Sequence, residues 1–307
     1  MIWKVSPAPH IHHKDTTATL MLDVITALMP CVIASVWLFG LRAALITVLS
    51  VIFCVLMEFV CQKIGKRPVG INDLSAVVTG IILALNMPST VPWWIVLIGA
   101  VFAIAIVKQL FGGIGDNFLN PAMAARAVLL ASWPARMNTY VLPRTVAAAD
   151  AVSSATVLSG GYSASMIDMI VGRIPGAMGE VCKIAILLGL VYLLIRRTIT
   201  WHIPVIMIGS FMLFAWAFGM DPIAGVLSGG ILFGAVFMAT DYVTSPFTTK
   251  GKVIFGLGCG FLTALIRVFG NYMEGVTFAI LLMNLVVPYI NDLTLTKPFG
   301  GIQDENK

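Results

Sequence analysis

A polar stretch near the middle of the chain carries the side chains best suited to chemistry. Residues 150–156, Asp-Ala-Val-Ser-Ser-Ala-Thr, place one carboxylate and three hydroxyls among small residues. Serine and threonine are common in loops, so taken alone these seven residues indicate a polar turn followed by a small-residue loop. Residues 158–161, Leu-Ser-Gly-Gly, do not continue as a phosphate-binding loop, because Tyr162 follows without the expected lysine.

A glycine-rich segment, residues 172–180, closes the same polar stretch and precedes an apolar run. It contains Gly176, Gly179 and Glu180. Such a turn at the start of a helix can let backbone N–H groups approach an anion. Anion binding is therefore the chemistry that this segment favours by itself.

The rest of the chain is apolar enough to lie in a membrane and to position this stretch. Of the 307 residues, 59% are hydrophobic and 11% are charged, whereas a soluble domain has about 25% charged residues. Apolar runs of about twenty residues recur along the whole length, so we expect an all-α polytopic membrane protein. The net charge of +5 is typical of basic anchors on one membrane face and does not suggest nucleic-acid binding.

Ten membrane-spanning helices are expected, five on each side of the polar stretch. The expected spans are 19–39, 41–61, 71–87, 93–111, 118–133, 181–196, 201–219, 222–240, 252–270 and 275–291. This pattern divides the chain into an N-terminal segment (1–18), a first five-helix repeat (19–133), a long loop (134–180), a second five-helix repeat (181–291) and a tail (292–307). Asn86-Met87-Pro88 should end the third span and Met238–Asp241 the eighth.

Basic residues in the connections predict the orientation. Lys63 and Arg67 follow the second span, Arg196 follows the sixth, and Lys250 follows the eighth, whereas the loops after spans three and seven have no basic residue. The positive-inside rule then puts both termini in the cytoplasm and the long loop on the outer side.

The two halves of the chain share a weak internal repeat. Lys108 matches Arg267, and Gly80 matches Gly230 in the same order. Five helices per copy is an odd number, so the second copy is inverted, a transporter plan with ligand sites near the midplane. Lys108 and Arg267 either act within the membrane or snorkel to its interface, and their late place in their spans favours snorkelling.

Cysteines and histidines give no clear metal site. The five cysteines lie in or beside apolar runs without a CxxC pair, so we expect small buried apolar residues. His10, His12 and His13 cluster near the N-terminus, but no cysteine or second carboxylate is arranged with them. We interpret them as a surface segment. Thr16, with its neighbours Asp15 and Thr17, should cap the first helix.

Several motifs are similar to those of one known family. They are Ser6–His10, Leu22–Val24, Asp73–Gly80, Asn120–Arg126, Pro175–Glu180, Ala239–Asp241 and Pro246. On these residues, the chain resembles the family of the D subunits of Rnf complexes and, more distantly, the B subunits of sodium-pumping NADH:quinone reductases. The resemblance covers essentially the whole chain.

The resemblance implies an FMN joined through its phosphate to the hydroxyl of Thr156. In this chain Asp150 stands at the start of the acceptor motif, Ser153 at its hydroxyl position and Ala155 before the threonine. Ser154 departs from the usual glycine. A small-residue turn would expose the threonine to a flavin transferase.

The same resemblance completes the expected cofactor-binding set with Gly176, Gly179 and Glu180; no catalytic residue and no metal ligand is expected. It implies two inverted five-helix repeats similar to those of urea channels. It also implies a second, non-covalent riboflavin, for which Asn86 and Asp241 mark places to look.

The function implied is electron transfer within an ion-translocating ferredoxin:NAD oxidoreductase complex, coupled to Na⁺ or H⁺ movement. The expected partners are the A, B, C, E and G subunits of an Rnf complex, especially the FMN-bearing G protein of that set, together with the lipid bilayer and the flavin transferase. The expected location is the cytoplasmic membrane of a bacterium or archaeon.

Two questions stay open from the sequence. Asp73, Asp116, Asp241 and Glu274 are candidates for the ion path because they are acids at span ends, but interface-solvated acids are the favoured interpretation. A small-solute channel or carrier on the same fold, without flavin, is the alternative function. That alternative would not explain residues 150–156.

Overall fold

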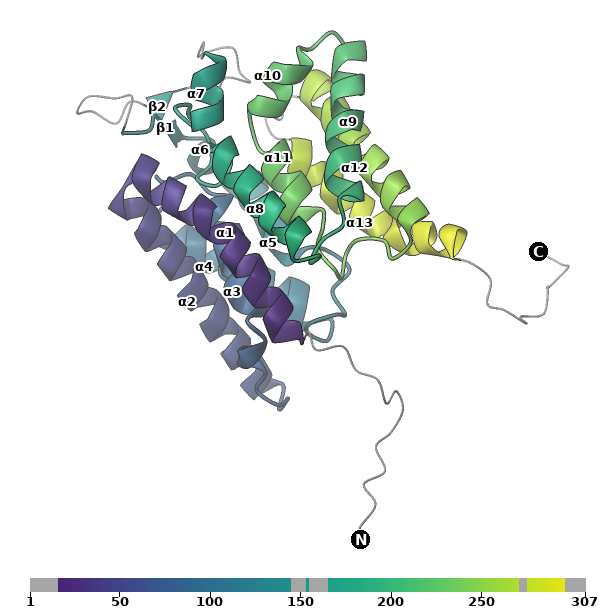
Figure 1. The fold of residues 1–307 in the computed structure, drawn as a ribbon. Helices are drawn as coiled ribbons and strands as arrows, with labels where there is room; N and C mark the ends of the chain where they lie inside the picture. Colours follow the sequence, from purple (N-terminus) through teal and green to yellow (C-terminus); the bar gives the residue numbers. More distant parts are fainter. Residues whose placement is uncertain (1–15, 145–152, 155–164, 271–274, 296–307) are drawn as a thin grey trace, which may run out of the picture.

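The structure is a computed structural model that describes residues 16–144, 153–154, 165–270 and 275–295. Within these ranges the protein is almost entirely helical (Figure 1). The first half contains α1 (Thr17–Phe39), α2 (Leu41–Ile64), η1 (Ile71–Asp73), α3 (Ser75–Leu85), α4 (Trp93–Val101), the π-helix η2 (Phe102–Gln109) and α5 (Pro121–Ser132).

The long polar stretch contains short elements that gather at one end of the molecule, away from the start of α1 (Figure 1). They are α6 (Pro134–Met137), β1 (Tyr140–Val141), β2 (Ser153–Ser154) and α7 (Met166–Val171). The second half contains α8 (Lys183–Ile195), α9 (His202–Ala217), α10 (Pro222–Leu227), α11 (Ile231–Phe233), the π-helix η4 (Gly234–Met238), α12 (Thr249–Phe269) and α13 (Gly275–Thr294).

Four of these helices, α1, α2, α12 and α13, are long and apolar enough to cross a membrane. Shorter apolar helices are α3, the continuous run Trp93–Gln109, α5, α8 and α9. The protein is therefore a multi-pass membrane protein. Helical segments occupy the places of the expected spans, but the arrangement as ten helices in two inverted repeats stays a prediction.

Side-chain caps and prolines set where the helices begin. Thr16 caps α1 as expected, since its hydroxyl accepts a hydrogen bond from the backbone N–H of Thr19 at 3.3 Å. Asn120 caps α5 and Asp221 caps α10 through the amides two and three residues later. In both helices the next residue is a proline, which tolerates the first helical position because it needs no N–H partner there.

Helix ends also follow the sequence signals, with one difference. Helix α3 stops at Leu85 and η4 stops at Met238, which confirms the expected breaks. The eighth expected span, 222–240, is not one helix, because Ser228 has an extended backbone and Gly229 takes a positive φ of 78°. Glycine adopts that conformation without the strain that a Cβ would cause.

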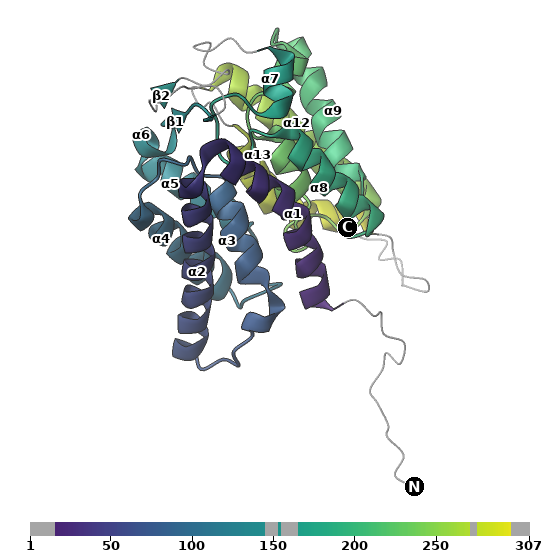
Figure 2. The same ribbon diagram turned by 60° about the vertical axis from the view of Figure 1, so that its left-hand side comes forward.

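Helix α1 packs against α8 as well as α2, and so joins the two halves (Figure 2). The backbones approach closely, since a Cβ added at Gly189 would lie 2.5 Å from the carbonyl oxygen of Ala27. At one end of this contact Arg196 pairs with Asp23 at 3.2 Å, and Tyr192 donates a hydrogen bond to the same carboxylate.

Helices α9 and α12 form another close contact that depends on a glycine. A Cβ at Gly260 would lie 2.5 Å from the carbonyl oxygen of Met207 and 2.8 Å from the amide nitrogen of Phe211. Because both neighbours are backbone atoms of a helix, neither can move aside alone. Small residues of this kind let membrane helices pack at short distance.

We therefore expect Gly260→Ala to lower the unfolding temperature of the protein in detergent, with a loss of stability of about 1–3 kcal/mol from overpacking. Gly209→Ala on α9 is the matched control, because nothing lies within 4 Å of a Cβ at that position. Thermal unfolding followed by circular dichroism compares the two. Equal unfolding temperatures for both variants would contradict the role of the close contact.

Candidate functional site

The motif that we expect to accept flavin, residues 150–156, is described only in part. Asp150, Ala155 and Thr156 lie outside the described residues. Ser153 and Ser154 form β2, which pairs antiparallel with β1, with Ser154 opposite Tyr140 and Ser153 opposite Val141. The backbone of Ser153 and Ser154 is therefore paired with the start of the polar loop.

The glycine-rich segment packs against the broken end of α3. The amide of Gly179 donates to the carbonyl of Leu85 at 2.7 Å, and the amide of Met178 donates to Met87 at 3.1 Å. A Cβ at Gly179 would lie 2.7 Å from the Cβ of Leu85. The amides of Met178 and Gly179 thus already donate hydrogen bonds within the chain. Gly179 has no side chain because the two backbones approach closely there.

Glu180, the last residue of that segment, forms a buried ion pair with Arg126 of α5. The guanidinium Nη1 lies 2.9 Å from the carboxylate Oε1, and it also donates to the side-chain oxygen of Asn86. Arg126 and Glu180 are both only 2% exposed. Gly230 leaves the room for the carboxylate, since a Cβ there would collide with Glu180.

Two further cations lie near Glu180. Lys183 is 1% exposed, and its ammonium group donates to the backbone carbonyls of Glu180 and Gly229. Arg267 of α12 donates to the carbonyl of Gly225 at 2.6 Å, and Lys183 and Arg267 both interact electrostatically with Glu180. We call Arg126, Lys183, Arg267 and Glu180 the cation cluster.

Tyr140 connects the strand pair to the cation cluster. Its side chain is buried, and its hydroxyl interacts electrostatically with Arg126 and Glu180. Burial raises the pKa of Tyr140 most, the nearby guanidinium of Arg126 opposes this, and the carboxylate of Glu180 adds to it. The residue opposite Ser154 therefore lies close enough to Arg126 and Glu180 for their charges to affect its pKa.

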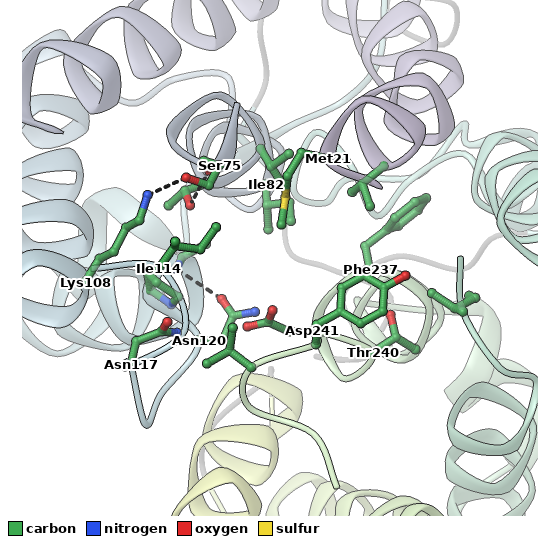
Figure 3. Close-up of a pocket in the computed structure, with 18 of the residues that line it drawn as sticks. Met21, Ser75, Ile82, Lys108, Ile114, Asn117, Asn120, Phe237, Thr240 and Asp241 are labelled. Atoms are coloured by element: carbon green, nitrogen blue, oxygen red, sulfur yellow. Dashed lines mark hydrogen bonds between the residues drawn. The ribbon is translucent and has the colours of Figure 1, made fainter. Parts of the chain in front are cut away.

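A cavity lies between the two halves (Figure 3). Its empty space, counting its open mouth, is about 780 Å³. Lys108 and Ser75 lie on one side of it, and Phe237, Thr240 and Asp241 lie on the other (Figure 3). The remaining labelled lining residues are Met21, Ile82, Ile114, Asn117 and Asn120.

Lys108 at the edge of this cavity does not snorkel, contrary to our prediction. The residue is 3% exposed, and its ammonium group lies 2.6 Å from Glu58 Oε1 and donates to Ser75 Oγ at 2.5 Å. The predicted anchoring was wrong because a carboxylate on α2 pairs with the lysine inside the protein. The guanidinium of Arg267 likewise points inward, at 5.0 Å from the ring of Phe211.

The four acids proposed for the ion path differ in their surroundings. Asp73 accepts hydrogen bonds from the amide and hydroxyl of Ser75, and Asp116 is exposed. Glu274 lies outside the described residues. Asp241 lines the cavity, and burial raises its pKa, while hydrogen bonds from Thr244 and the backbone of Val243 lower it by less.

Glu58, Lys183 and Tyr140 were not predicted from the sequence. Glu58 is a single acid inside the long apolar helix α2, and such a residue is by itself a signal of function. Among the described residues, no group of three or more His, Cys, Asp or Glu could hold a metal ion. The three clustered histidines near the N-terminus lie outside those residues.

Comparison with known proteins gives matches over nearly the full length. A model of the family described as NQR2, RnfD, RnfE matches residues 4–300. The chain is 46% identical over 305 residues to the D subunit of the Na⁺-translocating ferredoxin:NAD⁺ oxidoreductase complex of Acetobacterium woodii, covering 96% of this chain and 95% of that one.

Of two other relatives, one is named for proton translocation and the other for ion translocation without a stated ion. The chain is 39% identical over 320 residues to the D subunit of the proton-translocating ferredoxin:NAD⁺ oxidoreductase complex of Clostridium ljungdahlii, covering 97% and 96% of the two chains. It is 33% identical over 348 residues to the D subunit of the ion-translocating oxidoreductase complex of Citrobacter koseri, covering 98% and 99%.

The buried pair of Glu180 and Arg126 should be essential for stability. Glu180→Gln removes the carboxylate that lies 2.9 Å from the guanidinium, so we expect a loss of about 3–5 kcal/mol in the free energy of unfolding. Arg173→Gln is the control, because Arg173 is half exposed and lies 3.9 Å from Asp168; its loss should stay below about 1 kcal/mol. Chemical unfolding in detergent measures both, and similar losses would disprove the difference.

The carboxyl of Asp241 should make stability depend on pH. Its pKa is raised from the ordinary 3.8 in the folded protein, so the charged form destabilises the fold above the raised pKa, and this cost disappears as the pH falls through it. Asp241→Asn should therefore raise the unfolding temperature at pH 8 and lose this gain towards pH 4. Exposed Asp292→Asn should give no such pH-dependent gain, and a gain constant with pH in Asp241→Asn would reject the explanation.

Proposed function

Because the chain belongs to the NQR2, RnfD, RnfE family, we propose that it is a membrane electron-transfer subunit of an ion-translocating ferredoxin:NAD oxidoreductase complex. The observation that carries this proposal is the similarity over nearly the whole chain to the D subunits of two such complexes. Four helices able to cross a membrane agree with this function. In the full complex, this chain would assemble with the A, B, C, E and G subunits. The G subunit would bind at the face of the polar loop.

We propose further that Thr156 carries FMN, joined through the flavin phosphate to its hydroxyl. Support comes from the motif between Asp150 and Thr156 and from the strand pair that fixes Ser153 and Ser154. When bound, FMN supplies one- and two-electron transfer, and the protein contributes position and electrostatics. The strand pair limits where the tether begins, and attachment itself would require a flavin transferase.

The cavity between the halves is the place we propose for a second, non-covalent flavin. Apolar side chains such as Met21, Ile82 and Phe237 offer faces against which a flat ring can pack. The hydroxyls of Thr79 and Thr240 donate to backbone carbonyls, so their oxygens can still accept hydrogen bonds from a ligand. Asp241, one of the two places favoured by sequence, lines this cavity, whereas Asn86 instead binds Arg126.

The transported ion would be Na⁺ or H⁺, since relatives named for each ion match nearly the whole chain. Of the four acids considered, Asp241 is the best placed for the ion path, because it lines a cavity between the halves. Basic connections support termini in the cytoplasm and a polar loop on the outer side of a cytoplasmic membrane. Lys108 donates a hydrogen bond to Ser75, shortly before Gly80, and the matched Arg267 donates one to Gly225, shortly before the matched Gly230. These equivalent contacts support inverted repeats.

A small-solute channel or carrier is the second candidate function. The cavity between the two halves favours it, because transporters with inverted repeats bind their ligands there. It gives no role to the acceptor motif. The presence or absence of a covalently bound flavin therefore discriminates between the electron-transfer function and the channel or carrier.

We expect the full chain, co-expressed with a flavin transferase, to give a fluorescent band under ultraviolet light after denaturing electrophoresis. Thr156→Val should abolish this band, because it removes the acceptor hydroxyl and keeps the shape of the side chain. Ser159→Ala, which lies outside residues 150–156, is the control and should keep the band. Flavin released into the supernatant on denaturation reports the second, non-covalent flavin separately.

A dark wild-type band in the presence of the transferase would refute covalent attachment and leave the channel as the better candidate. A band that persists in Thr156→Val would instead mean that the acceptor is a different residue.

A further inference from the structure

A groove lies between the last turn of α2 and the end of the π-helix η2. Cys61 and Ile64 of α2 line one side of it, and Ala105 of η2 and the adjoining Leu110 line the other. Its empty space, counting its open mouth, is about 680 Å³. Ile64 is 77% exposed and Leu110 is 72% exposed, so the walls present apolar surface to the outside of the molecule. We call this site the end groove.

The end groove lies where α2 leaves the hydrocarbon layer of the membrane. Helix α2 has 24 residues, so at 1.5 Å per residue its length is about 36 Å, which exceeds the roughly 30 Å of hydrocarbon in a bilayer. Its last turn is at the same end of the molecule as the start of α1 (Figure 1). The apolar walls of the groove therefore face acyl chains, and the turn that follows Ile64 lies at the depth of the lipid headgroups.

Arg67 is the charged residue among those that line the end groove. Its Nη1 donates hydrogen bonds to the carbonyls of Gly112 at 2.8 Å and of Gln109 at 3.3 Å, and these bonds fix the guanidinium in place. The side chain is still exposed, and the acids of the nearby connections, Asp73 and Asp116, do not line the groove. A fixed and accessible guanidinium is well suited to bind a phosphate group.

Two lysines add positive charge beside Arg67. Lys63 lies in the last turn of α2, with its ammonium group 4.9 Å from the centre of the Phe59 ring. Lys66 has a positive φ of 51°, a backbone conformation that is strained for a residue with a Cβ and that glycine adopts easily. The chain thus has a cation at a position where glycine would be less strained.

We propose that the end groove binds an anionic phospholipid, with the lipid phosphate at Arg67 and one acyl chain along Cys61, Ile64 and Leu110. A phospholipid joins a negative group to an apolar chain, and the groove places a cation next to apolar walls in the same order along the membrane normal. Lys63 and Lys66 favour a lipid with net negative charge, because basic residues beside a membrane helix attract anionic headgroups. The binding is non-covalent and does not depend on a bound flavin.

Cys61 can report whether the groove is occupied, because it lines the groove and is partly exposed. The full chain is purified in detergent and treated with N-ethylmaleimide, and alkylation of each cysteine is followed by mass spectrometry of peptides. Cys182, the other partly exposed cysteine, is the internal standard. Added phosphatidylglycerol should slow alkylation of Cys61 in a saturable way and leave that of Cys182 unchanged. Phosphatidylcholine, which has no net charge, and glycerol phosphate, which has no acyl chain, should not protect Cys61 at the same concentrations.

Lys66→Gly should raise the phosphatidylglycerol concentration that gives half protection by about fivefold, the effect of one basic residue near an anionic headgroup. Because this substitution also relieves the positive φ, the unfolding temperature should not fall, so weaker protection would not come from unfolding. Arg67→Gln should weaken protection at least as much; if it is not recovered as a monodisperse protein, Lys66→Gly decides alone. Lys250→Gln removes an exposed positive charge at the start of α12 and should leave half protection unchanged.

Equal protection of Cys61 by phosphatidylglycerol and phosphatidylcholine would overturn the proposal, because the cations would then play no part in binding. Protection by glycerol phosphate alone would mean that the site binds a free phosphate and not a lipid. Slower alkylation of both cysteines would reveal a general effect of lipid on the micelle and would equally reject a site in the groove.

Discussion

The ion pair between Arg126 and Glu180 is the interaction on which the centre of the molecule depends. It joins α5 to the segment that leads into α8, and through Asn86 it also fixes the end of α3. Both charges are buried, so each needs the other to offset its lost hydration. The neighbouring glycines follow from this geometry, because Gly230 makes room for the carboxylate and Gly179 lets the segment lie against Leu85.

Around this pair, charge within the apolar protein is distributed in two ways. Lys108 with Glu58 forms a neutral pair beside the cavity between the halves. The matched Arg267 lies against an aromatic ring and belongs to the cation cluster around Glu180. One site thus borders a cavity, and the other surrounds the carboxylate of Glu180.

The sequence predicts the helical segments well because lipid allows few alternatives for the backbone. Runs of apolar residues, Thr16 as a cap, and the breaks at Asn86 and Met238 all have local causes that a single sequence contains. The partners of Lys108 and Arg126 could not be predicted in the same way. Glu58 is 50 residues from Lys108, and Glu180 is 54 residues from Arg126, so only the packing of helices brings these pairs together. Snorkelling was predicted for Lys108 because its position in the span was visible and its carboxylate partner was not.

The contact between α1 and α8 has a consequence for biosynthesis. Asp23 finds Arg196, and with it Tyr192, only after 173 further residues of chain have been made. At about 5–20 residues per second, the ribosome needs roughly 10–35 s for that length. During this time the first helix carries an acidic side chain whose final partner does not yet exist. The nascent first half is therefore an incomplete folding unit, and the side of α1 that faces α8 stays uncovered until α8 is made.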